Sequence, residues 1–413
     1  MKIILLTQWY IPEPANLIGA LAESMQQAGH EVTVLTGFPN YPSGELYPGY
    51  KIKLWQREEI SGVPVIRFPL YPNHDQSSWK RILNYTSFSQ SVAMLAPWLA
   101  RKPDVIHVYS PPLTSAWPAC LLSRLWKVPF TYEIQDMWPE TLKATGMINN
   151  ERVLRLIGRF ADRVYRRAAA IRVISAGFRD NLIKKGVPAE KIHVISNWVD
   201  TDQQPPQPAD PLLANQLGLA DRFNVMFAGT LGFAQGLDSV LDAAAQLNDI
   251  PQAQFVFVGS GVDSDRLHRI CEQRSLANVK FLGRFPPEEM TRILALADVL
   301  LVHLRPDPLF SITIPHKIFD YLSAGKPVLA AMEGDAAAVI AHARAGLVCQ
   351  PGNPTALAET VRQFFAMSDA ERVSLGANGR RVVVEEYNRP LLAGRVVEML
   401  ESVARKSTAR GKR

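Results

Sequence analysis

The sequence contains little cysteine and no long hydrophobic run. Three of its 413 residues are cysteines, and no two of them form a CxxC pair: Cys120, Cys271 and Cys349. This spacing argues against a disulfide framework and a structural zinc site, so we expect small buried thiols in a reducing compartment. No window of about 18 residues is both uncharged and apolar, so no membrane-spanning helix is expected. The apolar run after Met1 is too short for a signal peptide, which predicts a cytoplasmic protein.

The glycine motif of dinucleotide-binding enzymes is also missing. Such enzymes carry GxGxxG directly after a strand. The turn after the first predicted strand has no glycine before Gly19. After a later strand, Gly259 and Gly261 lack the third glycine, because Ser264 stands in its place. A nicotinamide-dependent dehydrogenase is therefore not expected, and the later pair fits a plain strand-to-helix turn equally well.

The net charge of +6 is concentrated in the first half of the chain. Residues 1–200 contain 23 lysines and arginines against 16 acidic residues, and the last twelve residues of the chain carry five more cations. A basic half with a basic tail suits an anionic membrane surface or a phosphorylated lipid acceptor. The cations do not form a compact stripe interleaved with aromatic residues, so nucleic acid is not an expected partner.

Short β-rich apolar runs alternate with helical patterns along most of the chain. Such β-helix-β repeats predict α/β domains with doubly wound parallel sheets. The expected strands are 2–7, 31–36, 65–68, 104–109, 130–134, 170–174, 191–196, 224–228, 254–258, 279–282, 299–303, 327–331 and 346–349. The expected helices are 17–28, 79–101, 113–126, 151–169, 237–247, 263–274, 287–296, 315–324, 336–343 and 354–367. Gly29 is expected to end the first helix in the left-handed conformation.

Four prolines within seven positions, from Pro205 to Pro211, separate the two series of repeats. We therefore expect a first domain at 1–200, a linker at 201–222 and a second domain at 223–387. A last helix, 388–405, is expected to pack back on the first domain. Ligands of doubly wound sheets bind beyond the carboxyl ends of the strands, so a cleft between the two domains is the expected site.

A glycine-rich loop follows the first strand of the second domain. It reads Gly229-Thr230-Leu231-Gly232-Phe233-Ala234-Gln235-Gly236 and leads into a helix. Glycines let the backbone approach an anion, and a helix N-terminus supplies N–H donors. The loop can therefore hold a diphosphate, although a plain turn explains it equally well.

A second candidate segment runs from Leu309 to Val328. Thr313 is a plausible N-cap, and Ile314-Pro315 places proline at the favoured start of a helix. Lys317 and Asp320 are three residues apart and share one face of that helix. A lysine can meet phosphate charge while a carboxylate accepts hydrogen bonds from a ribose diol. By spacing alone, a solvated lysine–aspartate pair remains an alternative.

The residues from Asp320 to Val328, DYLSAGKPV, resemble the E-A-x-A-x-G-x-P-V signature of family 4 retaining glycosyltransferases. Other family motifs follow in order over nearly the whole chain. They are 29–34 (GHEVTV), 197–200 (NWVD), 258–261 (VGSG) and 278–283 (NVKFLG). Two further blocks, 37–42 (GFPNYP) and 136–140 (DMWPE), are similar to the WbuB-like and WcaI-like subgroup, which builds O-antigen and exopolysaccharide units.

The resemblance implies a GT-B fold, a nucleoside-diphosphate sugar donor, no metal or other cofactor, and retention of anomeric configuration. Asp320 takes the position of the second acid in the family's E-x7-E pair, which meets the nucleotide ribose. The first acid falls at Ile312. Backbone N–H groups of Ser311, Ile312 and Thr313 are expected to hold the sugar hydroxyls and phosphates instead, next to Ile314.

The family's two phosphate-binding cations are also replaced. They align with Thr230 and Gln235, so Lys317 is expected to be the main substitute and Arg305 the second. The loop Gly283-Arg284-Phe285 is expected to contact the nucleobase through backbone groups. Gln135 stands where many relatives carry a histidine near the donor sugar.

The mechanism that the resemblance implies is a front-face displacement, in which the acceptor hydroxyl passes its proton to a departing phosphate oxygen. Lys317 would stabilise the leaving diphosphate. Asp136 and Glu140 are expected on the acceptor side, where they can orient or deprotonate the acceptor. A helix-capping role for Asp136 and a first-turn dipole role for Glu140 are the structural alternatives.

Two other functions share these features. A sugar-nucleotide 2-epimerase has the same scaffold, but the motifs offer few acid–base side chains for it. A non-catalytic sugar-nucleotide-binding subunit is favoured by the missing cations and acid, and disfavoured by the intact segment around Asp320. The expected substrates are a UDP-linked sugar and a lipid-linked or saccharide acceptor. Trp79 and Trp98 on the predicted helix 79–101 are compatible with contact with the inner face of a membrane. A helix packed on the sheet with a partly exposed face is the alternative.

Overall fold

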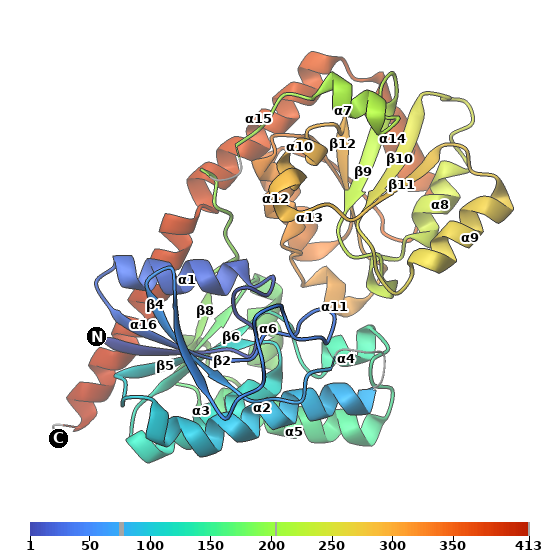
Figure 1. The fold of residues 1–413 in the computed structure, drawn as a ribbon. Coiled ribbons are helices and arrows are strands. Elements are labelled where there is room, and N and C mark those ends of the chain that lie inside the picture. The colour runs from blue at the N-terminus through green and yellow to red at the C-terminus, as the bar shows by residue number, and fades with distance from the viewer. Residues whose placement is uncertain (74–77, 203–204, 412–413) are drawn as a thin grey trace. The chain divides into compact units, whose positions relative to one another are not determined.

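The computed structural model describes residues 1–73, 78–202 and 205–411, which fold into two compact units (Figure 1). The first unit contains Met1–Ser196 and Arg389–Arg413, and the second contains Asn197–Asn388. Each unit has one mainly parallel sheet with helices on both faces, which confirms the predicted α/β, doubly wound architecture. Residues 203–204 of the predicted linker, and Lys412 and Arg413 of the basic tail, lie outside the described residues.

The sheet of the first unit has the strand order β3-β4-β2-β1-β5-β6-β7-β8. Every neighbouring pair is parallel except β3 and β4. The central strands are buried on both faces, which explains their continuous apolar sequences. The strands are β1 (Lys2–Leu6), β2 (Glu31–Gly37), β3 (Gln56–Ile60), β4 (Val63–Phe68), β5 (Val105–Ser110), β6 (Phe130–Ile134), β7 (Ala170–Val173) and β8 (Ile192–Val194).

Helices cover both faces of this sheet. The C-terminal helix α16 (Arg389–Gly411) packs on α1 (Asn16–Gln27) and contacts β5 and β7, while α2, α3 and α5 pack together on the opposite face (Figure 1). The remaining helical bounds are α2 (Ser78–Leu99), η1 (Leu113–Ser115), α3 (Ala116–Trp126), α4 (Glu140–Ala144), α5 (Glu151–Arg167), α6 (Ala176–Lys184) and η2 (Ala189–Lys191). Gly29 follows α1 with φ +81, as predicted for a left-handed helix end.

The sheet of the second unit is entirely parallel, in the order β11-β10-β9-β12-β13-β14. Its strands are β9 (Phe223–Ala228), β10 (Ala253–Val258), β11 (Val279–Gly283), β12 (Val299–His303), β13 (Val328–Ala331) and β14 (Gly346–Cys349). Because all six strands run the same way, their carboxyl ends meet at one edge, where ligands of such sheets bind.

The helices of the second unit enclose a core that includes Phe227, Phe255 and Leu301. They are α7 (Pro211–Gln216), η3 (Phe233–Gln235), α8 (Asp238–Ala244), α9 (Ser264–Arg274), η4 (Pro287–Glu289), α10 (Met290–Leu294), α11 (Pro308–Ser311), α12 (Lys317–Ser323), α13 (Gly334–Ala343), α14 (Pro354–Ala366) and α15 (Asp369–Glu386). Within the described residues, no helix has the length and apolar character needed to cross a bilayer.

Several elements differ from the sequence-based prediction. The predicted linker contains the helix α7, which begins at Pro211 and is capped by the Asp210 side chain, because proline suits the first helical position. The strand β3 was not predicted, and it is antiparallel to β4, so the first sheet is not entirely parallel. The helices α6, α11 and α15 were also not predicted. The Ser368–Glu371 capping box at the start of α15 is a signal in the sequence that would have identified it.

Candidate functional site

The loops after β9 and β10 lie against each other at the carboxyl edge of the second unit's sheet. A Cβ placed on Gly259 would lie 2.0 Å from the carbonyl oxygen of Gly229, and one on Gly261 would lie 2.1 Å from that of Leu231. Only glycine permits such close backbone approach. The loop after β12 joins them, because the backbone N–H of Arg305 donates to the carbonyl of Ala234 at 3.0 Å. The structure therefore brings the predicted glycine-rich loop and Arg305 together.

Tyr321 attaches α12 to the end of β9. Its buried hydroxyl accepts a hydrogen bond from the N–H of Ala228 at 2.8 Å and donates to the carbonyl of the same residue at 3.0 Å. This double contact places the first turn of α12 beside Gly229. The Nζ of Lys317 would lie only 2.7 Å from a Cβ at Gly229, which has φ +143 and has no such atom. Glycine at this position thus makes room for the lysine.

Lys317 carries a buried ammonium group at this edge. Its Nζ lies 3.7 Å from the ring centroid of Phe227 and has no hydrogen-bond acceptor within the described part of the chain. Burial lowers the pKa of Lys317 to about 7, although the Asp320 carboxylate acts in the opposite direction. A buried cation without an acceptor is costly to a fold, and such groups are frequent where an anion binds.

Asp320 is paired with a residue that the sequence did not single out. Its Oδ2 lies 3.2 Å from Nδ1 of His316, and Nε2 of the same imidazole lies 3.0 Å from the carbonyl oxygen of Trp198. Both ring nitrogens thus face acceptors, and this arrangement favours the doubly protonated form of the ring. Burial opposes this charge, but Asp320 and the two hydrogen bonds outweigh it, and the pKa of His316 is raised. His316 thus lies between the Asp320 carboxylate and the Trp198 carbonyl and contacts both.

The segment before α12 differs from prediction. The helix begins at Lys317 rather than at Ile314-Pro315, and Thr313 is not its N-cap, because its hydroxyl donates to the carbonyl of Leu309 at 2.8 Å. The backbone N–H groups of Ser311, Ile312 and Thr313 donate within and directly after α11, over 3.2 to 3.3 Å. Those three amides are thus already used, and this expectation is corrected. The cause is α11 itself, a turn that starts at Pro308 and is capped by Asp307.

The other predicted donor-binding residues lie on the same sheet edge. Thr230, Arg284 and Arg305 are exposed, and Gln235 and Phe285 are half-buried. Arg284 and Phe285 directly follow β11, whose last residue, Gly283, accepts a hydrogen bond from Gly259 at 2.7 Å. Gly232 is buried and Ile314 is 7% exposed. Their contacts with a donor stay predictions.

In the first unit, Asp136 follows β6. It does not cap the next helix, which was the structural alternative to a role toward the acceptor. The following helix α4 has Pro139 at its N-cap position, with no capping side chain. Burial raises the pKa of Asp136 to about 6. A carboxyl group with this pKa is well suited to accept a proton near neutral pH, which agrees with the predicted role toward the acceptor.

Glu140 lies in the first turn of α4 and forms an ion pair with Lys185. Its Oε1 is the atom in contact, while its Oε2 is buried and has no hydrogen-bond partner among the described residues. This ion pair supports the structural interpretation of Glu140 as much as the catalytic one.

A buried ionic cluster holds Gln135 at the end of β6. The Glu133 carboxylate accepts from Gln135 Nε2 at 2.6 Å and pairs with Arg172 at 2.6 Å and His107 at 3.0 Å. Burial acts to raise the pKa of Glu133, but Arg172 and His107 outweigh it and lower the pKa to about 2. Arg172 also donates to the carbonyl of Ile195 at 3.0 Å and to that of the next residue at 2.8 Å. The cluster thus connects β6 to the backbone at Ile195 and Ser196, where the first segment of the first unit ends.

Comparison with known proteins relates both units to the same class of enzyme. Residues 14–198 match the model of the glycosyl transferase 4-like domain, and residues 212–382 match that of the glycosyl transferases group 1. WcaI of Escherichia coli K12, which carries the description "putative colanic acid biosynthesis glycosyl transferase", is 29% identical over 399 residues, which cover 94% of this chain and 95% of WcaI. The chain is a glycosyltransferase of the GT-B, family 4 type.

Further comparisons agree with this identification. The probable glycosyltransferase WbjE of Pseudomonas aeruginosa is 28% identical to this glycosyltransferase, over 70% of this chain and 72% of WbjE. The solved structure of Anabaena Alr3699/HepE in complex with UDP has the same fold, with a TM-score of 0.73 and 21% identity, covering 97% of this chain and 100% of that one. The 2-epimerase and the non-catalytic subunit are therefore set aside.

Two residues of the glycosyltransferase were missed by the motif analysis: His316 and Tyr321. Both lie inside the predicted donor segment, but their partners are 118 and 93 residues away in the sequence. An i, i+4 spacing between His316 and Asp320 was the available signal for the first. No local signal pointed to the second. Among the described residues, no cluster of three or more histidine, cysteine or acidic side chains could hold a metal ion.

Proposed function

We propose that this glycosyltransferase moves a sugar from a nucleoside-diphosphate sugar, with UDP as the preferred nucleotide, to a lipid-linked or saccharide acceptor in surface-polysaccharide assembly. The observation that carries the donor site is the buried Lys317 ammonium beside Gly229, without an acceptor of its own in the described chain. A diphosphate at this edge would supply the missing anion. The likeness to WcaI, which is described as a putative colanic acid biosynthesis glycosyl transferase, supports the polysaccharide context.

The proposed mechanism is a front-face displacement that retains the anomeric configuration without a metal or other cofactor. The bond between the anomeric carbon and the donor phosphate oxygen breaks, and Lys317 stabilises the negative charge that develops on the diphosphate. Arg305, exposed next to the glycine-rich loop, is a second cation for the same charge. The acceptor oxygen bonds to the anomeric carbon on the face that the diphosphate leaves. Its proton goes to the departing phosphate oxygen.

Asp136 is proposed to orient the acceptor hydroxyl in the first unit. Asp320, held by His316, is proposed to accept hydrogen bonds from the ribose hydroxyls, because one carboxylate oxygen is directed to the imidazole and the other is left for the ligand. Arg284, Phe285, Thr230 and Gln235 are proposed to line the nucleotide and sugar positions along the same edge.

The test is turnover of radiolabelled UDP, GDP, ADP and dTDP sugars in the presence of extracted membrane lipids and of free saccharides. Label is expected to pass from a UDP sugar into a lipid or saccharide product, and NMR of that product should show the donor's anomeric configuration. Reaction with GDP sugars alone would refute the UDP preference. Inversion would refute the front-face mechanism.

We also propose that the first unit contacts an anionic membrane surface. On α2, Trp79 and Trp98 are 79% and 87% exposed. The neighbouring face of α5 carries six exposed arginines: Arg152, Arg155, Arg159, Arg163, Arg166 and Arg167. Exposed tryptophans with many cations are typical of interfacial binding. Sedimentation with vesicles that contain phosphatidylglycerol should show salt-sensitive binding. The double variant Trp79→Ser plus Trp98→Ser should weaken this binding. Leu212→Ser, at a similarly exposed site of the second unit, should not weaken it.

A further inference from the structure

Two loops at the carboxyl edge of the first unit's sheet are held by buried charged side chains. Residues 7–15 connect β1 to α1, and residues 38–55 connect β2 to β3. The strand ladders end at these loops, so backbone groups that are shielded from water there need other hydrogen-bond partners. Glu13 and Arg67 supply several of them, and the two residues are themselves only 2% and 0% exposed. Two buried charges thus help to determine how the loops lie against each other.

The Glu13 carboxylate binds three backbone N–H groups. Its Oε2 accepts from Tyr10 at 3.0 Å, within its own loop. Its Oε1 accepts from both Asn40 and Tyr41 at 2.9 Å, in the loop after β2. Each oxygen of a carboxylate can accept more than one hydrogen bond, and here each faces a different loop. A single side chain therefore connects the loop after β1 with the loop after β2.

Arg67, on β4, binds carbonyl groups of the same two segments. Its guanidinium donates to the carbonyl of Gly37 at 2.9 Å and to that of Ile11 at 2.5 Å. Burial raises the pKa of Glu13 to about 7, although its three amide donors and Arg67 act to lower it. A buried carboxylate is costly to a fold, and such groups are frequent at functional sites. The fold thus retains Glu13 despite this cost.

An aromatic pair, Trp9 and Tyr41, lies on the backbone that Glu13 holds. Trp9 belongs to the loop after β1 and Tyr41 to the loop after β2, and their rings stack with centroids 4.6 Å apart. Tyr41 donates its own N–H to Glu13. Trp9 directly precedes Tyr10, which also donates to this carboxylate. Both rings are half-buried. The position of one ring against the other therefore depends on Glu13.

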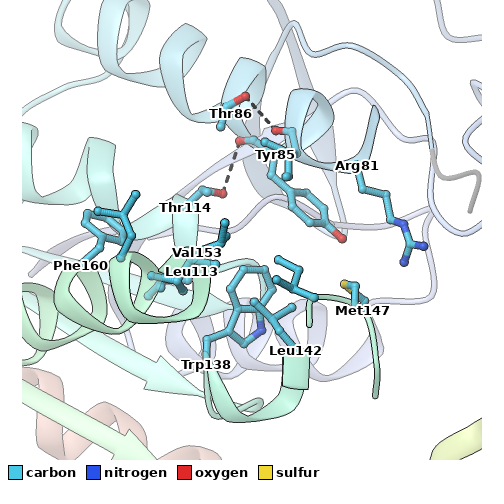
Figure 2. A pocket seen from close by; sticks show the side chains of 14 residues that line it. Arg81, Tyr85, Thr86, Leu113, Thr114, Trp138, Leu142, Met147, Val153 and Phe160 are labelled. Atoms are coloured by element: carbon cyan, nitrogen blue, oxygen red, sulfur yellow. Dashed lines mark hydrogen bonds between the residues drawn. The ribbon is translucent and has the colours of Figure 1, made fainter. Parts of the chain in front are cut away.

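Tyr85, on α2, relates the aromatic pair to Asp136. Its ring lies 6.3 Å from that of Trp9, and Figure 2 shows it with Arg81 on the wall of an apolar cavity between α2, η1, α4 and α5. Burial raises the pKa of Tyr85 to about 12, against the Arg81 charge. Tyr41 and Asp136 add to this rise, so both lie near the Tyr85 hydroxyl. The aromatic pair is therefore close to the carboxylate that is proposed to orient the acceptor.

We propose that Glu13 is a positioning residue for the acceptor, because it holds the two rings of the aromatic pair as one surface beside Asp136. The proposal rests on the proposed function, which assigns the acceptor hydroxyl to Asp136. At 2% exposed, Glu13 itself does not reach a substrate and acts through the two loops. An acceptor that lies against the aromatic pair presents its hydroxyl to Asp136 only when both loops are in place.

The test compares wild type with Glu13→Met, which keeps the length of the side chain and removes both acceptor oxygens. The donor is a radiolabelled UDP sugar, and the acceptor is whichever of membrane lipid extract and free saccharide takes up the label. Assays at pH 8 keep the Glu13 carboxyl mostly ionised in wild type. The kcat/KM for the acceptor should fall roughly 100-fold, mainly through KM, which is the cost of misplacing a positioning group by about 1 Å. The Kd for the UDP sugar should stay unchanged, because the donor residues belong to the other unit.

Glu13→Gln separates hydrogen bonding from charge. Both variants are neutral, but the glutamine oxygen can still accept from Asn40 and Tyr41 while its NH2 group faces the N–H of Tyr10. Its kcat/KM for the acceptor should therefore lie between those of wild type and Glu13→Met. Equal loss in the two variants would overturn the proposal, since the hydrogen bonds to the loops would then have no effect. Glu13→Gln keeps the side-chain volume and serves alone if Glu13→Met does not fold, in which case a kcat/KM equal to that of wild type would overturn the positioning role.

Met25→Ala is the control for lost stability. Met25 is 0% exposed near the far end of α1, so its truncation should lower Tm without touching the two loops. Its kcat/KM for the acceptor should remain that of wild type. A fall as large as in Glu13→Met would mean that Glu13 contributes general stability only, and the proposal would be wrong.

A combined variant tests whether Glu13 acts through the aromatic pair. In a chain that carries Trp9→Leu plus Tyr41→Leu, Glu13→Gln should have little further effect on kcat/KM for the acceptor, because the rings that it positions are gone. Full additivity of the two effects would contradict action through these rings.

Failure of this proposal and failure of the proposed function give different results. Absence of transfer by wild type would refute the proposed function. Transfer by wild type with an equal kcat/KM in Glu13→Met would refute the positioning role alone. Hydrogen exchange needs no turnover. The amides of Tyr10, Asn40 and Tyr41 should lose protection in Glu13→Met relative to the amides of β5, and equal protection in the two proteins would overturn the proposal.

Discussion

Donor affinity should depend on pH through one lysine. The free enzyme holds the Lys317 ammonium in a buried position that lowers its pKa to about 7. A bound diphosphate stabilises the protonated form, so binding above neutral pH must be accompanied by uptake of a proton. The dissociation constant for a UDP sugar should then rise with pH, in inverse proportion to the protonated fraction of the lysine.

The expected size follows from the pKa. A group with pKa about 7 in the free protein, kept protonated in the complex, weakens binding about 30-fold between pH 6 and pH 8.5, or about 2 kcal/mol. Lys317→Met removes the charge and keeps most of the stem. At pH 6 it should weaken binding by about 10- to 150-fold, the range for a hydrogen bond to a charged group. Its affinity should then be flat between pH 6 and pH 8.5.

The assay is calorimetric titration with a UDP sugar in buffers of different ionisation enthalpy, which reports affinity and proton uptake together. A sugar nucleotide is preferable to UDP, because a terminal phosphate itself titrates near pH 6. Uptake should approach one proton at pH 8.5 in the wild type and none in Lys317→Met. Lys326→Met is the matched control, since burial also lowers the pKa of Lys326, beside Asp298 before β13. A wild-type affinity independent of pH, or a slope that survives Lys317→Met, would refute the reasoning.

Three further outcomes follow from the charged groups. If the Asp136 carboxylate orients the acceptor hydroxyl, kcat/KM should rise with pH through about 6, and Asp136→Asn should remove that rise and lower kcat/KM by about 10- to 150-fold, the range for a hydrogen bond to a charged group; an unchanged pH profile would contradict the role. The pKa of His316 is raised in the folded protein. Its stabilising contribution is therefore complete below the pKa of an unfolded histidine and is lost as pH rises through the folded pKa. The difference in Tm between wild type and His316→Gln should shrink with rising pH. Arg172→Met leaves the buried Glu133 charge without its main partner. The free energy of unfolding, measured in urea, should therefore fall by about 3–5 kcal/mol. Arg179→Met, at an exposed site on α6, should change that free energy little.

The strands were predictable because of where they lie. A central parallel strand such as β10 is buried on both faces, so its sequence is a continuous apolar run that stands out from its surroundings. β3 (QREEI) lies at the sheet edge and alternates half-buried with exposed residues, and its charges concealed it. The helix α15 was concealed by glycines that resemble helix breakers. A Cβ on Gly376 would lie 2.0 Å from the carbonyl oxygen of Gly325, so glycine there allows close packing rather than ending a helix.

The candidate site was predictable only as a segment. Local spacing selected Lys317 and Asp320, because residues three apart on a helix share a face. Their partners depend on distant parts of the chain. The carbonyl of Trp198 contributes to the raised pKa of His316, and the hydroxyl of Tyr321 holds the helix against β9 beside Gly229. No periodicity records either contact, and the motif alone could not show that the amides of Ser311 to Thr313 are used within α11.

The pairing of Asp320 with His316 changes the meaning of the lysine beside it. A lysine and an aspartate on one helix face would ordinarily neutralise each other, which was the structural alternative for this pair. Here the carboxylate lies 3.2 Å from the His316 ring nitrogen Nδ1, and the ammonium of Lys317 lies over the Phe227 ring without an oxygen acceptor in the described chain. The resemblance to family 4 enzymes implies phosphate-binding cations at the positions that Thr230 and Gln235 occupy here. The diphosphate would thus depend on a lysine whose pKa is about 7, and donor binding by this enzyme should respond to pH changes that enzymes with an arginine at that edge would not sense.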